Sequence, residues 1–393
     1  MTMQTLISSP GKVILFGEHA VVYGKSAIAA SLGLRTYVKT KDDTESPTLV
    51  VSFPDVDFKA AFTLKNMMQD NKRFRNGDVS PEALDKDLLS SLKQFAQLPE
   101  DSDNPKHLAL ASLLYLYFCI HISYGLPPLQ IEVRSRIPIG AGLGSSAAFS
   151  TSLAASFLIR TNQLMPLQTS ELSPRNNVNT RTFTAEDLAL INKWALQCER
   201  IMHGNPSGID NSVSTYGEAI LFQKSKISFL SCLPQFRIIL FNTKQPRSTK
   251  QLVENVRIKY NLYPDIIRPV LDSIEGVTTA CIACCQQETS VDQKLATMCD
   301  LVAMNQQLLE VLGVSHAKIQ QLCSIVAKHG LAAKLTGAGG GGCVFAIVPT
   351  AFTEDALESC MQDARENKFE AWLTSIGGDG VSHHQCNDFF DTL

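Results

Sequence analysis

The sequence comprises 393 residues, of which 45% are hydrophobic and 19% charged, with 35 Lys and Arg against 38 Asp and Glu. This balance is typical of a globular protein without a nucleic-acid or membrane partner, and the length predicts two domains. The N-terminus lacks the basic and apolar regions of a secretory signal, and the longest apolar run (108–120) is too short to cross a bilayer, so we expect a cytoplasmic protein.

The first forty residues predict a strand, a turn and a helix. KVILFGEHAVV (12–22) supplies the strand and the turn, and the small residues SAIAASLGL (26–34) follow. KDDTESPT (41–48) is a polar break of the kind found in hairpins, and residues 97–107 predict a loop. The apolar run 108–120 then predicts a buried helix.

A strand and a helix are predicted on either side of residue 140. Apolar and polar residues alternate over 129–137, which is typical of a strand. Apolar residues recur every three or four positions over 145–160, which is typical of a helix. Ser145 or Ser146 is expected to cap the start of this helix with its hydroxyl group.

The connection between them, PIGAGLGSSAA (138–148), is rich in glycine. Gly140, Gly142 and Gly144 lack Cβ atoms, so an anion can come close to the backbone amides of the loop and to the helix N-terminus. The loop fits neither the Walker motif nor the dinucleotide-binding fingerprint. It predicts a phosphate site, and the alternative is a tight turn that binds nothing.

An irregular stretch with two prolines (164–183) precedes the next predicted helix and is a candidate insertion. The helix is expected to begin after Thr184, where Asp187 completes a capping box, and to end at Gly204. Residues 203–211 then form a loop.

The second half of the chain predicts another layer of strands and helices. Residues 237–249 indicate a strand that leaves into a polar turn, and helical segments follow between about 250 and 330. A second glycine loop (337–342) leads into a strand that begins at Cys343.

The chain has 11 cysteines, and only Cys281, Cys284 and Cys285 are clustered. Inside the cell we expect free thiols rather than disulfides. The segment around the cluster has helical character, so we expect buried helical cysteines, with a metal site as the alternative.

Three loops of small residues lie in order along the chain, at 9–24, 138–148 and 334–343. Together they resemble the GHMP kinases, a family of ATP-dependent kinases that phosphorylate small molecules, over nearly the whole sequence. The resemblance implies an α+β fold with two domains and a site in the cleft between them. The N-terminal domain (1–225) would be similar to ribosomal protein S5 domain 2, with one left-handed crossover, and the C-terminal domain (226–393) would be ferredoxin-like.

Two segments are similar to one branch of this family. PGKVILFGEHAVVYGK (10–25) and ERIMHGNPSGIDN (199–211) resemble the members that phosphorylate the C5 hydroxyl of mevalonate, an early step of isoprenoid and sterol synthesis. The resemblance implies ATP and Mg²⁺ as cofactors, mevalonate as the small-molecule substrate, and a homodimer. The alternatives are another small-molecule kinase of the same family, or an inactive member that senses a ligand.

The resemblance also assigns catalytic roles. Asp210 would accept or orient the hydroxyl proton, and Lys12 would stabilise the charge that develops on the reacting oxygens. Mg²⁺ would be held by Ser146 and Glu199, because this cation prefers oxygen ligands. Taken alone, Asp210 also fits a turn-forming residue, Lys12 a solvated lysine and Glu199 a charge on a helix surface.

The remaining contacts implied by the resemblance involve the nucleotide and the substrate. Glu18, His19 and Thr243 would contact the substrate, although a lone histidine in a turn is more often structural. At Asp55 the family pattern has Asn, which leaves the adenosine contact there open. The nucleotide-binding positions are Lys12, Asp55, Ser135, Gly140, Ala141, Gly142, Leu143, Gly144, Ser145 and Ser146.

Overall fold

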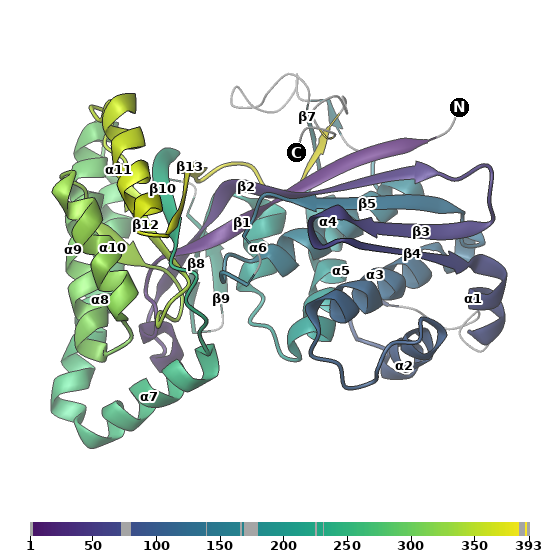
Figure 1. Ribbon diagram of the computed structural model, residues 1–393, viewed down its shortest axis with the longest axis horizontal. Coiled ribbons are helices and arrows are strands. Elements are labelled where there is room, and N and C mark those ends of the chain that lie inside the picture. Colours follow the sequence, from purple (N-terminus) through teal and green to yellow (C-terminus); the bar gives the residue numbers. More distant parts are fainter. Residues whose placement is uncertain are drawn as a thin grey trace.

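The computed structural model describes residues 3–71, 80–138, 140–165, 167–168, 180–224, 226–230, 232–384 and 390. It has two lobes joined by one extended, mostly antiparallel sheet (Figure 1). The main path of this sheet has the strand order β11-β12-β10-β13-β2-β1-β14-β7-β6. The predicted insertion over 164–183 lies largely outside the described residues.

The N-terminal lobe is formed mainly by the first part of the chain. Its strands are β1 (Gln4–Phe16), β2 (Ala27–Asp42), β3 (Thr48–Phe53), β4 (Phe58–Thr63), β5 (Leu129–Ser135), β6 (Leu167–Gln168), β7 (Thr180–Thr182), β8 (Ala219–Gln223), β9 (Lys226–Phe229) and β14 (Ser382–His384). Its helices are α1 (Leu64–Asp70), α2 (Lys86–Phe95), α3 (Pro105–His121), α4 (Ser145–Arg160), α5 (Ala185–His203) and α6 (Ile209–Tyr216), with short 3₁₀ turns at Ala20–Tyr23, Pro54–Val56 and Ile122–Tyr124.

The C-terminal lobe has four strands and five helices among the described residues. The strands are β10 (Phe236–Asn242), β11 (Ala333–Leu335), β12 (Cys343–Ile347) and β13 (Glu370–Ile376). The helices are α7 (Thr249–Leu262), α8 (Pro264–Gln286), α9 (Val291–Leu312), α10 (Ala317–Lys328) and α11 (Glu354–Glu366).

Strand β2 is the centre of the N-terminal lobe, since it pairs with β1, β5 and β8. The polar break at 41–48 does not close a hairpin between neighbouring strands, because β5 lies between β2 and β3. Strand β3 runs parallel to β5, with Val51 opposite Ile131. Helix α4 packs on β1 and β2, and α3 and α5 pack on α4, which places the main core between helices and sheet.

The expected helix over 26–34 is wrong, because this segment belongs to strand β2. Small residues carry little periodicity, so packing decides their conformation. Ala29 lies in a buried cluster with Val213 of α6 and Ile220 of β8. Its short side chain lets helix and sheet approach closely here, and this contact brings α6 against the strand that leads to the site.

The apolar run 108–120 is the buried helix that was predicted. Helix α3 is buried continuously from Leu110 to His121. By length and hydropathy alone the stretch Pro105–Tyr124 could span a membrane, but 67% of its apolar window is buried inside the lobe. Its contacts with α2, α4 and α5 account for its apolar composition.

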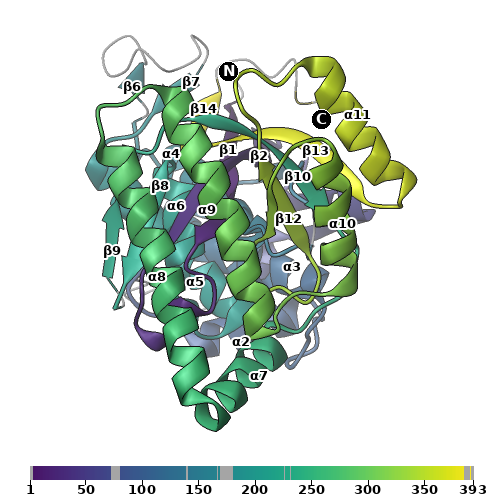
Figure 2. The same cartoon turned by 90° about the vertical axis from the view of Figure 1, so that its left-hand side faces the viewer.

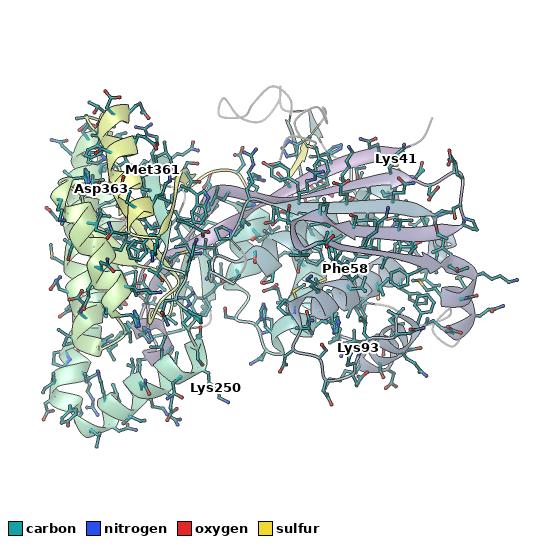
Figure 3. The ribbon with its side chains drawn as sticks, in the orientation of Figure 1. Lys41, Phe58, Lys93, Lys250, Met361 and Asp363 are labelled. Atoms are coloured by element: carbon teal, nitrogen blue, oxygen red, sulfur yellow. The ribbon has the colours of Figure 1, made fainter. Side chains whose placement is uncertain are left out.

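In the C-terminal lobe helices α9, α10 and α11 pack on strands β11, β12 and β13, and α8 packs against α9 (Figure 2). Helix α11 shows why they do so: Met361 packs into the core, whereas Asp363 on its outer side bonds His329 (Figure 3). Cys281, Cys284 and Cys285 are buried in α8 as free thiols. Among the described residues, no group of three or more His, Cys, Asp or Glu side chains forms a metal site.

The two lobes share strands at their junction. Ile376 of β13 pairs with Leu32 of β2, and the chain then returns to the N-terminal lobe. There β14 pairs with β1, with His384 opposite Leu6. The expected division of the chain at residue 225 stays a prediction, as does the handedness of the crossover.

Candidate active site

The glycine loop lies where strand β5 leads into helix α4. Gly140, Gly142 and Gly144 all have left-handed φ angles, of 72°, 77° and 72°. The expected serine cap is wrong: Gly144 is the N-cap, and Ser145 and Ser146 are the first two residues of the helix. Gly144 makes the left-handed turn that these serines could adopt only with strain. The first amides of α4 therefore lack acceptors within the helix and face the loop.

Lys12 and Asp210 meet beside this loop. Lys12 Nζ lies 3.2 Å from Asp210 Oδ1, and the backbone N–H of Lys12 donates to the carbonyl of Leu143 at 2.7 Å. A Cβ atom on Gly144 would lie 2.8 Å from Lys12 Cγ and 3.7 Å from Asp210 Oδ2. Asp210 stands in the first turn of α6, and its carboxylate faces Lys12. A glycine loop, an ammonium and a carboxylate thus share one small space.

Glu199 is a buried carboxylate on the neighbouring helix α5. It is 3% exposed, and its Oε1 has no hydrogen-bond partner among the described residues. Burial, and then the negative charge of Asp210, raise the pKa of Glu199 to about 8. A buried carboxylate with a free oxygen is a group that a cation would stabilise.

Ser146 lies next to Glu199 and provides a second oxygen. Its Oγ shares a hydrogen bond of 3.0 Å with His203 Nε2, and that nitrogen is 3.9 Å from Glu199 Oε2. The oxygens of Ser146 and Glu199 fit a hard cation such as Mg²⁺, which commonly takes one or two protein ligands together with phosphates and waters. Sequence reasoning did not assign His203 to the site. The signal that could have found it is its i, i+4 spacing from Glu199, which places both side chains on the same face of α5.

A cavity of about 190 Å³ opens beside the glycine loop. Its walls are mostly apolar and include Phe53, Val133, Phe149 and Met202. Such walls suit a flat heterocycle. The cavity also reaches Ser145 and Ser146 at the start of α4, so it is continuous with the predicted phosphate site.

Asp55 and Ser135 lie at the rim of this cavity and bond each other. Asp55 Oδ2 accepts the backbone N–H of Ser135 at 2.6 Å, and Ser135 Oγ is 2.9 Å from Thr36 Oγ1. The Asp at position 55 therefore fastens its 3₁₀ turn to the end of β5. This bond uses one of the two carboxylate oxygens of Asp55.

Arg247 of the C-terminal lobe lies against the glycine loop and was not identified from the sequence. Its Nη2 donates to the carbonyl of Ala141 at 3.2 Å, and its Nη1 donates to the carbonyl of Thr336 at 3.3 Å. A Cβ atom on Gly142 or Gly342 would collide with the guanidinium. Burial lowers the pKa of Arg247. The only sequence signal was its position in the polar turn after a strand.

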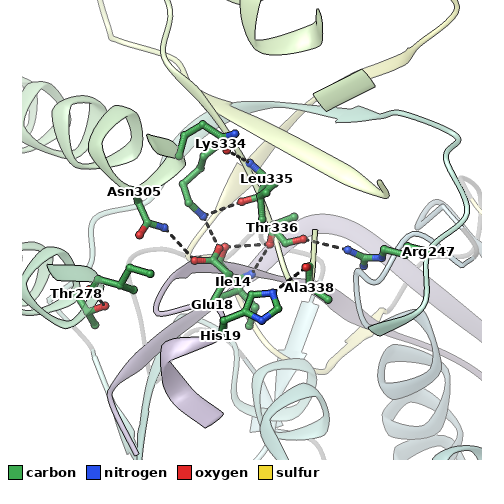
Figure 4. A network of polar contacts seen from close by, with 12 residues as sticks. Ile14, Glu18, His19, Arg247, Thr278, Asn305, Lys334, Leu335, Thr336 and Ala338 are labelled. Atoms are coloured by element: carbon green, nitrogen blue, oxygen red, sulfur yellow. Dashed lines mark hydrogen bonds and ion pairs between the residues drawn. The ribbon is translucent and has the colours of Figure 1, made fainter. Parts of the chain in front are cut away.

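The three predicted substrate contacts all lie near the second glycine loop, and Figure 4 shows two of them, Glu18 and His19. His19 Nε2 donates to the carbonyl of Ala338 at 2.8 Å, and burial lowers the pKa of His19. Thr243 Oγ1 donates to the carbonyl of Gly342 at 2.8 Å. Glu18 instead forms a buried ion pair with Lys334, so its carboxylate faces the C-terminal lobe.

The predicted residues thus form two groups, one around each glycine loop. Lys12, Asp210, Ser146 and Glu199 gather around the first glycine loop, where burial and the charge of Asp210 raise the pKa of Glu199. The substrate-side residues gather around the second loop. Arg247 bonds Ala141 of the first loop and Thr336, the residue before the second loop.

Two family models match the chain, GHMP kinases N terminal domain over residues 109–218 and GHMP kinases C terminal over residues 282–367. The chain is 42% identical to the mevalonate kinase of Bos taurus over 384 residues, covering 96% of this chain and 94% of that protein. It is 40% identical to the mevalonate kinase of Homo sapiens over 386 residues, covering 97% and 95%. Its fold is similar to that of the Methanococcus jannaschii mevalonate kinase, with a TM-score of 0.67 at 21% identity over 95% and 98% of the two chains.

Proposed function

The chain belongs to the GHMP kinases, and among them to the mevalonate kinases, and from that membership we propose which residues carry its reaction. The activity is transfer of the γ-phosphoryl group of ATP to the C5 hydroxyl of mevalonate. We assign the chemistry to Asp210 and Lys12. The observation that carries this assignment is their 3.2 Å ion pair next to Gly144, where an added Cβ would lie within 4 Å of both side chains.

Asp210 is proposed to take or orient the proton of the C5 hydroxyl. Its carboxylate pairs with Lys12, and its side chain is one-third exposed, so a substrate hydroxyl can reach it. Lys12 places a positive charge where the alkoxide and the transferring phosphoryl group develop negative charge. Phosphoryl transfer depends mostly on such positioning and charge neutralisation.

The glycine loop is proposed to bind the phosphates of ATP through its backbone amides and the N-terminus of α4. Arg247 supplies a cation from the opposite lobe, and its bond to Ala141 directs it at the loop. The base would occupy the apolar cavity lined by Phe149 and Met202. Binding of ATP in this pose excludes water from the Lys12–Asp210 pair.

Mg²⁺ is proposed to bind at Ser146 and Glu199. The free Oε1 of Glu199 and its raised pKa support this proposal, because a buried carboxylate without a partner favours a cation. When bound, the cation supplies positive charge to the phosphate oxygens. The protein's part is to hold the carboxylate beside the loop.

The Asp210→Asn variant tests the catalytic proposal. The change is nearly isosteric and removes the negative oxygen, so we expect kcat to fall by about 10²–10⁴ while KM for both substrates stays similar. The matched control is Asp272→Asn, which removes another lysine-paired carboxylate at the surface of α8, bonded to Lys25. A near-normal kcat in Asp210→Asn, or a loss as large in the control, would refute the assignment.

We also propose that the enzyme is a cytoplasmic homodimer. The family resemblance supports both parts of this proposal, and the near-neutral charge supports the first. Sedimentation of the purified protein and fractionation of cells that express it are the direct measurements. A monomer at micromolar concentration would contradict the proposed dimer, and a membrane-bound enzyme would contradict the proposed location.

A further inference from the structure

Glu18 and Lys334 form an ion pair that is almost completely buried between the two lobes (Figure 4). The two side chains are 1% and 0% exposed. Glu18 Oε2 also accepts the amide N–H of Asn305 at 3.0 Å. Lys334 donates to the carbonyl of Leu335 at 2.8 Å, and its ammonium lies 5.0 Å from the centre of the Phe345 ring. Both charges therefore have the partners that a buried pair requires.

The Glu18–Lys334 pair lies within a short seam that joins the lobes, formed by residues 14–19 and residues 334–338. Thr336 Oγ1 donates to the carbonyl of Ile14 at 3.0 Å and accepts the N–H of Ile14 at 2.9 Å. His19 reaches Ala338 in the same seam. The pair is the only contact between charged groups in the seam among the described residues.

Both sides of the seam lead directly to the proposed reaction centre. On one side, Ile14 follows Lys12 by two residues on strand β1. On the other, the carbonyl of Thr336 holds the guanidinium of Arg247. A shift of β11 relative to β1 would thus move Lys12 and Arg247 apart.

Neither member of the pair has a free polar group with which to bind a ligand. Both carboxylate oxygens of Glu18 are occupied, by Lys334 and by Asn305. The ammonium of Lys334 is enclosed by Glu18, the Leu335 carbonyl and aromatic rings. Their effect on the reaction must therefore pass through the residues that they hold in place.

We propose that Glu18 and Lys334 are positioning residues, which fix the seam between the lobes and so align Lys12 with Arg247 and His19. This inference rests on the proposed function, and it gives Glu18 a role other than substrate contact. An ion pair suits this task because a buried pair is stable only when its partners are held in one geometry.

The test compares two variants, the single variant Lys334→Met and the double variant Glu18→Gln/Lys334→Met. The single variant leaves an unpaired buried carboxylate and should be strongly destabilised. The double variant removes both charges, so its melting temperature should recover. Its kcat should nevertheless stay reduced on the order of 10²-fold, the loss expected for a misplacement of about 1 Å. The dissociation constant of mevalonate, measured by calorimetry, should change less than about 3-fold, whereas ATP should bind more weakly because Arg247 is displaced from the loop.

The surface control is Lys25→Met, since Lys25 also joins the first lobe to α8, through an exposed bond of 2.5 Å to Asp272. This variant should keep kcat, affinities and melting temperature. Asn305→Leu is a milder probe, because it removes one hydrogen bond to Glu18 together with an amide oxygen that is buried without a partner. It should lower kcat by about 3- to 10-fold.

Three results would overturn the inference. The double variant could have the kcat of the parent protein, which would make the pair a stability element only. It could lose mevalonate affinity at normal kcat, which would make Glu18 a binding residue. Asn305→Leu could leave kcat unchanged. The unsubstituted protein is assayed in parallel. If it did not phosphorylate mevalonate, the proposed function would be refuted, whereas the three results above refute only the positioning role.

Discussion

Alanine substitutions at the three glycines of the first loop can distinguish two effects: the cost of a left-handed backbone, and the steric conflict of a new methyl group with its neighbours. Gly140, Gly142 and Gly144 have nearly the same φ, so each alanine should cost a similar amount, about 1–2 kcal/mol, for a left-handed backbone. What differs is the space around the new methyl group. A Cβ atom at Gly140 has no heavy atom within 4 Å, whereas at Gly142 it meets the Arg247 guanidinium and at Gly144 it meets Lys12.

The three variants should therefore have similar stability and different kinetics. In Gly144→Ala the Cβ lies 2.8 Å from Lys12 Cγ, so the lysine must move away from Asp210. A shift approaching 1 Å in a catalytic group lowers kcat by about 10²-fold. Gly142→Ala displaces Arg247 and should raise KM for ATP by roughly 10- to 100-fold, since a hydrogen bond to a charged group contributes about 1.5–3 kcal/mol. Gly140→Ala should keep both parameters within a few-fold of the parent.

The assay is steady-state kinetics with ATP and mevalonate, with denaturant unfolding of each variant as the stability measurement. The comparison with Gly140→Ala subtracts the backbone effect, because that variant has the same φ and no steric conflict. An equal loss of kcat in all three variants would refute the reasoning. It would mean that the loop acts through its backbone conformation alone.

Two further predictions concern titratable groups. Glu199→Gln keeps the volume and removes the charge, so the Mg²⁺ concentration for half-maximal activity should rise by about 10-fold or more; an unchanged Mg²⁺ titration would return Glu199 to a structural role. Burial lowers the pKa of His121 to about 4 from 6.5, so its neutral form stabilises the fold above pH 6.5 and this contribution is lost as the pH falls toward 4. Between pH 7 and pH 5 the loss should be about 2 kcal/mol, and His121→Leu should remove this difference in unfolding free energy.

Local signals in the sequence predicted local structure well. The capping box at Thr184 depends on residues within one helical turn, and the structure contains both of its hydrogen bonds. The cap of α4 was misassigned because serine and glycine both favour the position, and the left-handed φ of Gly144 decided between them. The small residues at 26–34 have no hydrophobic period, and packing against α6 decides that this segment is a strand.

Contacts between the lobes could not be predicted from the residues alone. Arg247 reaches Ala141 across 106 positions, and Lys334 reaches Glu18 across 316. No periodicity or local motif relates residues so distant in sequence. The family resemblance supplied Asp210, Lys12 and Glu199, but it described Glu18 as a substrate contact, whereas the structure shows both its oxygens bound to other residues.

The pairing of β14 with β1 has a consequence for synthesis of the chain. Ser8, in a strand made at the beginning of translation, bonds His384, which is added 376 residues later. Until then the outer side of β1 along Leu6–Ser8 has no strand partner, and its amide and carbonyl groups form an open sheet edge. The N-terminal lobe therefore completes its sheet only after the C-terminal lobe has left the ribosome, and a premature stop before residue 382 would leave a nascent chain with an edge prone to aggregation.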